Sequence, residues 1–135
     1  MTNREYAYFR VTGLGKHETI TKILGFEPSE AWSEGDENPR TGKQREFMSW
    51  VMKSGHDDTE PMDRHIQSLL IFLGTRASSI QKLWVEYDLF IQCVGYYPPS
   101  GHGTHLDRET VRQAARLGLS FDMDYYFTDD HGHEV

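Results

Sequence analysis

The stretch from Leu119 to Phe127 constrains the fold more than any other part of the chain, because apolar and polar residues alternate along it. A period of two is typical of a β-strand with one face on a core and the other toward solvent. The polar face carries two carboxylates, Asp122 and Asp124, which need partners or water. The chain is therefore expected to build a sheet with two unlike faces. The apolar residues of the alternation are Leu119, Phe121, Met123, Tyr125 and Phe127.

Four further segments have the character of strands. Tyr6–Thr12 alternates in the same way, and Glu30–Ser33 is a short candidate. Glu46–Lys53 is apolar on both sides, which indicates a position inside the sheet. Asp88–Tyr97 is rich in Ile, Val, Phe and Tyr and is ended by Pro98. Together with the last strand, these segments predict a sheet of five strands.

Helical periodicity separates these strands. A short amphipathic helix is predicted over Lys16–Leu24, where Gly25 has the position of a left-handed C-cap. A longer helix should begin with Thr59 as its N-cap, stop at Gly74 and continue in a second segment. Asp107 should cap a last helix directly before the final strand. Each strand pair is therefore linked by a helix or a loop.

The order of these elements predicts an α+β fold. It contains a ferredoxin-like βαββαβ core with an added C-terminal helix and strand, and the helices should cover one face of a mostly antiparallel sheet. We expect a single domain over residues 1–135, with a frayed tail at residues 128–135. The uncovered face is too aromatic to be plain solvent surface. Its expected residues are Tyr6, Tyr8, Arg10, Phe90, Gln92, Val94, Tyr96, Asp122, Asp124 and Tyr126.

Composition narrows the class of protein. A formal charge of −7 disfavours a nucleic-acid binder and would suit a basic protein partner. The longest strictly apolar run, Leu69–Leu73, is far too short to span a membrane, and the first residues show no signal-peptide pattern. We therefore expect a cytoplasmic protein without membrane contact. The single cysteine, Cys93, excludes an internal disulfide and is interpreted as a small buried hydrophobe.

Several motifs, taken in order, resemble a known family over nearly the whole chain. They are Tyr6-Ala-Tyr8-Phe9-Arg10-Val11-Thr12-Gly13, Trp32-x-x-Gly35-Asp36, Ser49-Trp50, Cys93-Val-Gly95-Tyr96 and the closing Leu-x-Phe-Asp-Met-Asp-x-Tyr. In these motifs the chain is similar to the bacterial family called domain of unknown function 4279. That family has no assigned activity. The resemblance therefore implies a bacterial origin and a small stand-alone domain, and nothing about chemistry. It supplies no catalytic residues.

The polar residues of the uncovered face form the most suggestive constellation. If the first and last strands lie close together, the Arg10 guanidinium could meet Asp122 or Asp124, either as a structural ion pair or as part of a binding site. Basic residues of the loop before the third strand, Arg40, Lys43 and Arg45, could close over an anion. The candidate ligand- or partner-binding residues are Arg10, Tyr8, Trp32, Trp50, Tyr96, Asp122 and Asp124.

Catalytic and metal-binding motifs have little support. The sequence has no Gly-x-Ser-x-Gly elbow, no Walker-type glycine loop and no His-Glu-x-x-His helix. The histidines of the loop and tail, His102, His105, His131 and His133, match no established ligand spacing. We therefore expect no catalytic residues, no metal and no cofactor, and we favour a protein that is not an enzyme.

Three functions remain open. The first is a binding protein, in one version immunity- or antitoxin-like, that recognises a basic protein partner through an acidic or aromatic surface. The alternative is a sensor or enzyme for a small anionic ligand, using a cleft near Arg10 and the two strand aspartates. The third possibility is that the aromatic face is a homodimer interface.

Overall fold

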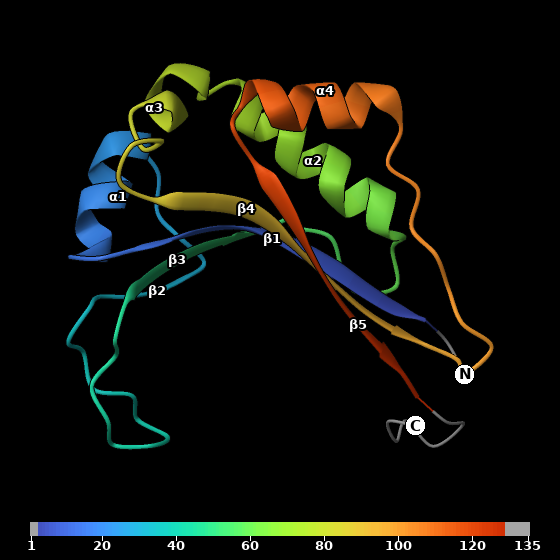
Figure 1. Cartoon of the computed structure of the whole chain (residues 1–135), viewed down its shortest axis with the longest axis horizontal. Helices are drawn as coiled ribbons and strands as arrows, with labels where there is room; N and C mark the ends of the chain where they lie inside the picture. Colours follow the sequence, from blue (N-terminus) through green and yellow to red (C-terminus); the bar gives the residue numbers. More distant parts are fainter. Residues whose placement is uncertain (1–2, 129–135) are drawn as a thin grey trace.

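The central strand of the sheet is β1 (Arg4–Gly13), which pairs antiparallel with β3 (Met48–Lys53) and with β4 (Asp88–Tyr97). The short strand β2 (Glu30–Trp32) lies outside β3, and β5 (Ser120–Phe127) runs parallel to β4 at the opposite edge. The resulting order is β2-β3-β1-β4-β5 (Figure 1). This computed structural model describes residues 3–128. The predicted α+β class with a mostly antiparallel sheet is confirmed.

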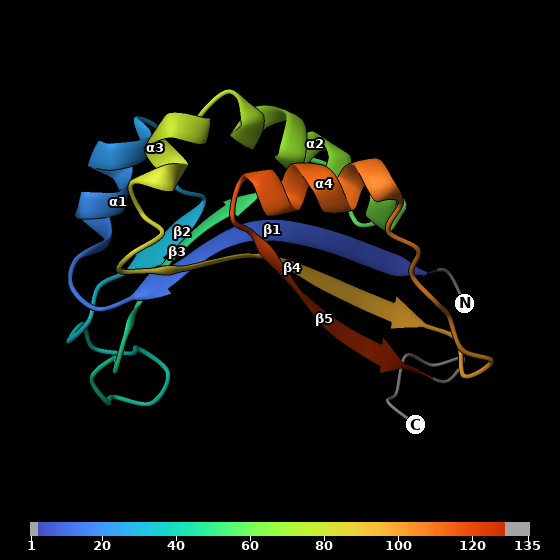
Figure 2. The ribbon, with the colours of Figure 1, turned by 45° about the horizontal axis from the view of Figure 1, so that its top comes forward.

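In the described part of the chain four helices connect the strands, and in Figure 2 they all lie on the same side of the sheet. They are α1 (His17–Leu24), α2 (Met62–Gly74), α3 (Ala77–Gln81) and α4 (Arg108–Arg116). No helix of the described chain covers the other side, which we call the open face. The register places the following residues on it: Arg4, Tyr6, Tyr8, Arg10, Thr12, Glu30, Trp32, Ser49, Val51, Lys53, Phe90, Gln92, Val94, Tyr96, Ser120, Asp122, Asp124 and Tyr126.

The core forms between the helices and the alternate residues of β1. Phe9 and Val11 are fully buried, and the Phe9 ring meets the Trp50 ring edge-on with centroids 6.0 Å apart. Trp50 is itself fully buried, and its indole N–H donates to the Thr21 hydroxyl of α1 over 3.0 Å. Burial of each such side chain contributes about 1.5–3 kcal/mol. Trp50 is therefore a core residue, on the face opposite Arg10.

Helix ends follow local sequence signals in most places. Gly25 adopts a left-handed conformation with φ of 84° and ends α1. The Asp107 carboxylate accepts from the backbone N–H of Thr110 over 2.8 Å and caps α4. The chain leaves helical structure after Gly74, before α3 begins. These three expectations are confirmed.

The start of α2 differs from the prediction that Thr59 is its N-cap. The helix begins at Met62, so Pro61 occupies the N-cap position without a side-chain cap. The Thr59 hydroxyl instead donates to the Asp57 carboxylate within the preceding turn. A short Asx-type turn competes successfully for Thr59, because Asp and Thr side chains bond readily to residues two positions away.

The last strand holds an edge position rather than a central one. Phe121 and Tyr125 are half-buried, and Met123 is 42% exposed although it faces the helix side of the sheet. Within residues 3–128, β5 has a strand neighbour on one side only, so the core covers its apolar face incompletely. The alternation predicted the strand and its two faces, while the edge position followed from the pairing of other strands.

The backbone of Gly95 in β4 packs directly against the side chain of Tyr97. A β-carbon at Gly95 would lie 2.3 Å from the hydroxyl of Tyr97, whose ring crosses directly over this position. The Tyr97 hydroxyl donates to the buried carboxylate of Glu5 over 3.0 Å. The ring of His102 stacks on Tyr97 with centroids 3.9 Å apart. Gly95 is therefore required by packing and not by a turn.

We expect Gly95→Ala to destabilise the protein by about 1–3 kcal/mol, because the added methyl group displaces the fully buried Tyr97 ring. Urea unfolding measures the change. Gly103→Ala is the control, since no heavy atom outside its chain neighbours lies within 4 Å of that added carbon. Equal stability of the two variants would show that Tyr97 moves aside without cost.

Candidate functional site

A groove of about 510 Å³ lies on the open face along β1, β2 and β3. This volume falls in the range of about 300–1,000 Å³ that is usual for small-molecule sites. Trp32 lies toward one end of the groove, and the turn after β3 forms the other end, where the Asp58 carbonyl accepts from the Glu5 N–H. The side chains that define it are Tyr6, Tyr8, Arg10, Glu30, Trp32 and Lys53, with Ser54, His56 and Asp58 in the turn.

Arg10 is the groove cation that has no carboxylate partner. Its Nε donates to the Ser49 hydroxyl over 3.0 Å, and this bond fixes the half-buried side chain against β3. Within residues 3–128 its terminal nitrogens form no hydrogen bond and no ion pair. Lys53, in contrast, pairs with Glu30 over 3.5 Å. The groove therefore contains one positioned guanidinium whose outer donors are available.

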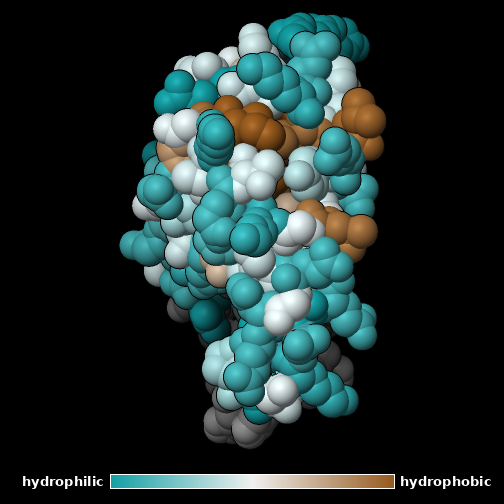
Figure 3. Space-filling model, turned by 90° about the vertical axis from the view of Figure 1, so that its left-hand side faces the viewer, coloured by the Kyte–Doolittle hydropathy of each residue, from teal (hydrophilic) through white to brown (hydrophobic). Residues whose placement is uncertain are grey.

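Trp32 closes the groove at the end near the loop of residues 33–47. Its indole N–H donates to the Phe47 carbonyl over 2.9 Å, and the Arg45 guanidinium lies 3.9 Å from the centre of its ring. The loop is itself hydrogen-bonded, for example from the Gly35 N–H to the Arg45 carbonyl. Figure 3 shows the side of the molecule on which this loop projects, where its surface is largely hydrophilic. Arg45 thus holds Trp32 in place.

Two tyrosines of β1 supply neutral donors to the groove. The rings of Tyr6 and Tyr8 stack with centroids 6.4 Å apart. Burial, followed by the neighbouring Tyr96, raises the pKa of Tyr6 to about 12. Burial also raises the pKa of Tyr8. Both phenols therefore keep their protons at neutral pH and can donate to an oxygen of a ligand.

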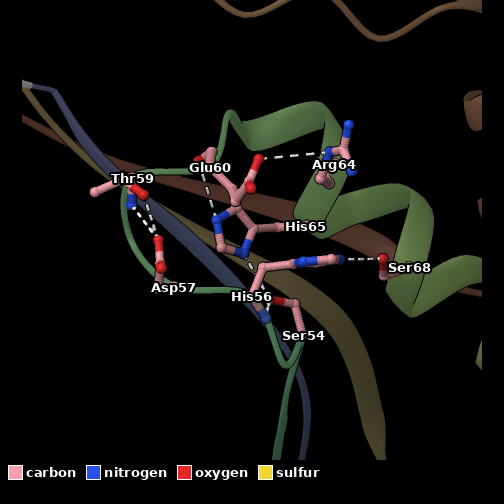
Figure 4. Close-up of polar contacts among 8 residues, drawn as sticks. All are labelled: Ser54, His56, Asp57, Thr59, Glu60, Arg64, His65 and Ser68. Atoms are coloured by element: carbon pink, nitrogen blue, oxygen red, sulfur yellow. Dashed lines mark hydrogen bonds and ion pairs between the residues drawn. The ribbon is translucent and has the colours of Figure 1, made fainter.

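A cluster of histidines and serines holds the turn at the other end (Figure 4). The Ser54 hydroxyl lies 2.6 Å from Nδ1 of His65, and Nε2 of His65 lies 3.1 Å from the Glu60 carbonyl. A carbonyl can only accept, so Nε2 carries a proton, and in a neutral imidazole Nδ1 then accepts from Ser54. Nε2 of His56 is 2.6 Å from the Ser68 hydroxyl of α2. Two imidazoles therefore tie the turn to the helix.

The Ser54–His65 pair has the geometry of a nucleophile and its base, with Glu60 orienting the imidazole. His65 is fully buried, however, and the backbone N–H of His56 donates to the Ser54 oxygen itself over 3.3 Å. That N–H does not point to where a substrate oxyanion would form. The pair is thus best explained as an anchor. Sequence reasoning missed these residues, although His65 within the apolar stripe of α2 was a visible signal.

Some predicted site residues lie together, and others do not. Arg10, Tyr8 and Trp32 line the groove, with the guanidinium carbon of Arg10 5.8 Å from the Trp32 ring centre. Trp50 is in the core on the other face. Tyr96 is on the open face outside the groove, where the Arg4 guanidinium lies 5.0 Å from its ring centre.

Asp122 and Asp124 do not reach Arg10. Arg10 is in register with Phe90 of β4, which is in register with Ser120 of β5, so a whole strand separates the guanidinium from the aspartates. Two strand spacings amount to about 10 Å, beyond an ion pair. None of the ion pairs in the described part of the chain joins them. The sequence could not reveal that β4 intervenes.

The histidines of the long loop and the tail are only partly described. His102 stacks on Tyr97, and His105 is exposed. His131 and His133 lie outside the described residues, as does the predicted frayed tail apart from Thr128, whose N–H donates to the Tyr97 carbonyl. Within residues 3–128, no three or more His, Cys, Asp or Glu side chains are grouped so that they could hold a metal ion.

The helices in this range are also too short or too polar to cross a membrane.

The fold and site define a class: an α+β domain with a ligand-sized groove on the open face of its sheet. The chain belongs to the family described as Domain of unknown function (DUF4279), whose model matches residues 3–128. The resemblance seen in the sequence motifs is thereby confirmed. No curated protein and no solved structure matches the chain.

The raised pKa of Tyr6 predicts a loss of stability in alkali. Because the folded value of about 12 exceeds the ordinary 10.0, the neutral phenol favours the folded state below pH 10, and this contribution disappears as pH rises from 10 to 12. We expect the melting temperature to fall less steeply over that interval in Tyr6→Phe than in the original protein. Melting curves and phenolate absorbance measure both effects. Parallel curves would contradict the assignment.

We expect His65→Leu to destabilise the protein by about 1–3 kcal/mol for each hydrogen-bonding group left unpaired, namely the Ser54 hydroxyl and the Glu60 carbonyl. His105→Leu on the exposed loop is the control. Urea unfolding of both variants measures the difference. If both variants match the original protein, the cluster does not anchor the turn.

Proposed function

We propose that the protein is a binding protein whose groove holds the anionic group of a small ligand on Arg10. The observation that carries this proposal is the guanidinium itself, fixed through Nε by Ser49 while its outer nitrogens remain unbonded within residues 3–128. A planar fork of this kind matches a carboxylate or phosphate in two-point contact. The Nε anchor lowers the entropy lost on binding, because the side chain is already ordered.

The surroundings of Arg10 indicate what the rest of the ligand is like. The Trp32 ring supplies a flat apolar surface near the guanidinium, and the phenols of Tyr6 and Tyr8 supply neutral donors. Val51 contributes an apolar floor between them. These features favour an anion with a flat, mostly apolar body.

A second candidate function is recognition of a basic protein partner, in an immunity- or antitoxin-like role. Asp122 and Asp124 favour it, because both are exposed on β5 and neither forms an ion pair within the described residues. The formal charge of −7 also favours this function, because it speeds the encounter with a basic protein.

We also propose that β1 to β4, with α1 and the α2–α3 connection, form a ferredoxin-like unit. The order β2-β3-β1-β4 and the antiparallel pairings of these strands support this assignment. α4 and β5 would then be an addition at the β4 edge, which does not alter the groove.

The groove is tested with benzoate and phenyl phosphate, two flat anions, by calorimetric titration. We expect Arg10→Ala to weaken binding about 10- to 100-fold, as for loss of a hydrogen bond to a charged group, and Arg10→Lys to restore only part of it. Arg116→Ala on α4 is the matched control. Native mass spectrometry of freshly purified protein would in addition show any anion retained by the original protein and lost from Arg10→Ala.

The groove proposal fails if neither probe binds and no anion co-purifies. It also fails if Arg10→Ala and Arg116→Ala have the same effect.

A further inference from the structure

The outer edge of β5 between Ser120 and Asp124 has no strand beside it in the described chain. β5 is the last strand in the sheet order, and β4 is its one pairing partner among the described residues. No described loop forms a backbone hydrogen bond with residues 120–124. The opposite edge, β2, has only three residues, so it offers a much shorter template. Unpaired backbone groups of this kind are a site for adding a further strand.

The side chains along this edge alternate in chemistry as well as in direction. Asp122 and Asp124 are exposed on the open face, in register with Gln92 and Val94 of β4. On the helix side, Met123 is 42% exposed. A strand placed beside β5 would have its own side chains directly beside these, about 5 Å away. The edge therefore offers carboxylates on one face and apolar surface on the other.

A second copy of this chain is a poor occupant of the edge. Antiparallel pairing about a two-fold axis at Met123 would place Asp122 directly opposite Asp124 of the other copy, in both halves of the pair. Like charges directly opposite one another destabilise a strand pair, and charges on edge strands are a common protection against self-association. The same carboxylates would attract a strand with cations at those positions.

We infer that the outer edge of β5 binds an extended segment of a basic partner protein as a sixth strand. Lys or Arg residues at alternate positions of that segment lie beside Asp122 and Asp124, and the apolar residues between them lie beside Met123. Backbone hydrogen bonds supply affinity and the alternation supplies specificity. This inference rests on the second candidate function and deepens it, and it is independent of the groove at Arg10.

Two synthetic peptides of equal composition test the inference. One alternates cations and apolar residues, Thr-Lys-Val-Lys-Val-Lys-Thr, and the other groups them, Lys-Lys-Lys-Val-Val-Thr-Thr. Each is titrated into the full-length protein while amide chemical shifts and hydrogen exchange are followed. We expect the alternating peptide to bind about tenfold more tightly. It should slow amide exchange at outward-pointing positions within residues 120–124 and leave β2 unchanged.

Variants locate the contact. The double change Asp122→Asn and Asp124→Asn should weaken the alternating peptide about tenfold or more, with the melting temperature unchanged or raised as like-charge repulsion is relieved. Glu27→Gln with Glu46→Gln removes the same charge from exposed sites away from β5 and should have no effect. Arg10→Ala should also leave peptide binding unchanged.

Several results would overturn the inference. Equal affinity of the two peptides would exclude strand addition. Binding that depends on the aspartates without slower amide exchange at residues 120–124 would exclude it as well. In either case the aspartates would act only as an acidic surface that attracts cations. Loss of peptide binding in Arg10→Ala would place the contact in the groove. A dimer in light scattering that breaks on Met123→Lys would show that a second copy occupies the edge. If benzoate binds and neither peptide does, the edge inference fails while the groove proposal stands.

Discussion

The structure depends on the two-sided chemistry of β1, the strand at the centre of the sheet. Phe9 and Val11 face the helices and are fully buried, whereas Tyr8 and Arg10 face away from them. Because the helices all lie on one side, the open face keeps its aromatic and charged side chains (Figure 2). A strand this asymmetric cannot shift by one residue without burying Arg10 and exposing Phe9. The core thereby fixes the position of the groove.

The groove combines a floor and side walls that belong to the sheet with two ends that depend on the neighbouring loops. Its floor is the sheet, where Ser49 and Val51 are buried beneath the surface side chains. Its two ends depend on polar contacts instead, from Arg45 to Trp32 at one end and from His65 to Ser54 at the other. Such contacts hold a side chain in one orientation but contribute less to the free energy of folding than the core does. Polar contacts thus orient the side chains at the ends of the groove, whereas the buried core supplies most of the stability of the fold.

The open face carries a cationic side chain and a pair of carboxylates at two separate places. Arg10 offers donors to an anion on the β1 side, and Asp122 and Asp124 offer acceptors to cations at the β5 edge. β4 separates them and prevents mutual neutralisation, since a direct contact would consume both charges in an ion pair. Arg10 and the two aspartates therefore do not neutralise one another in the described part of the chain.

The sequence by itself determined most of the helix ends and the two faces of the first and last strands. Gly25 and Asp107 mark helix ends, and the alternation around Tyr8 and Phe9 assigns their faces, because these signals act between residues close in the chain. Only the tertiary structure decided which strands are neighbours. It placed β4 between Arg10 and Asp122, and it brought Ser54 to the buried His65, because strand pairing and burial depend on the packing of the whole chain.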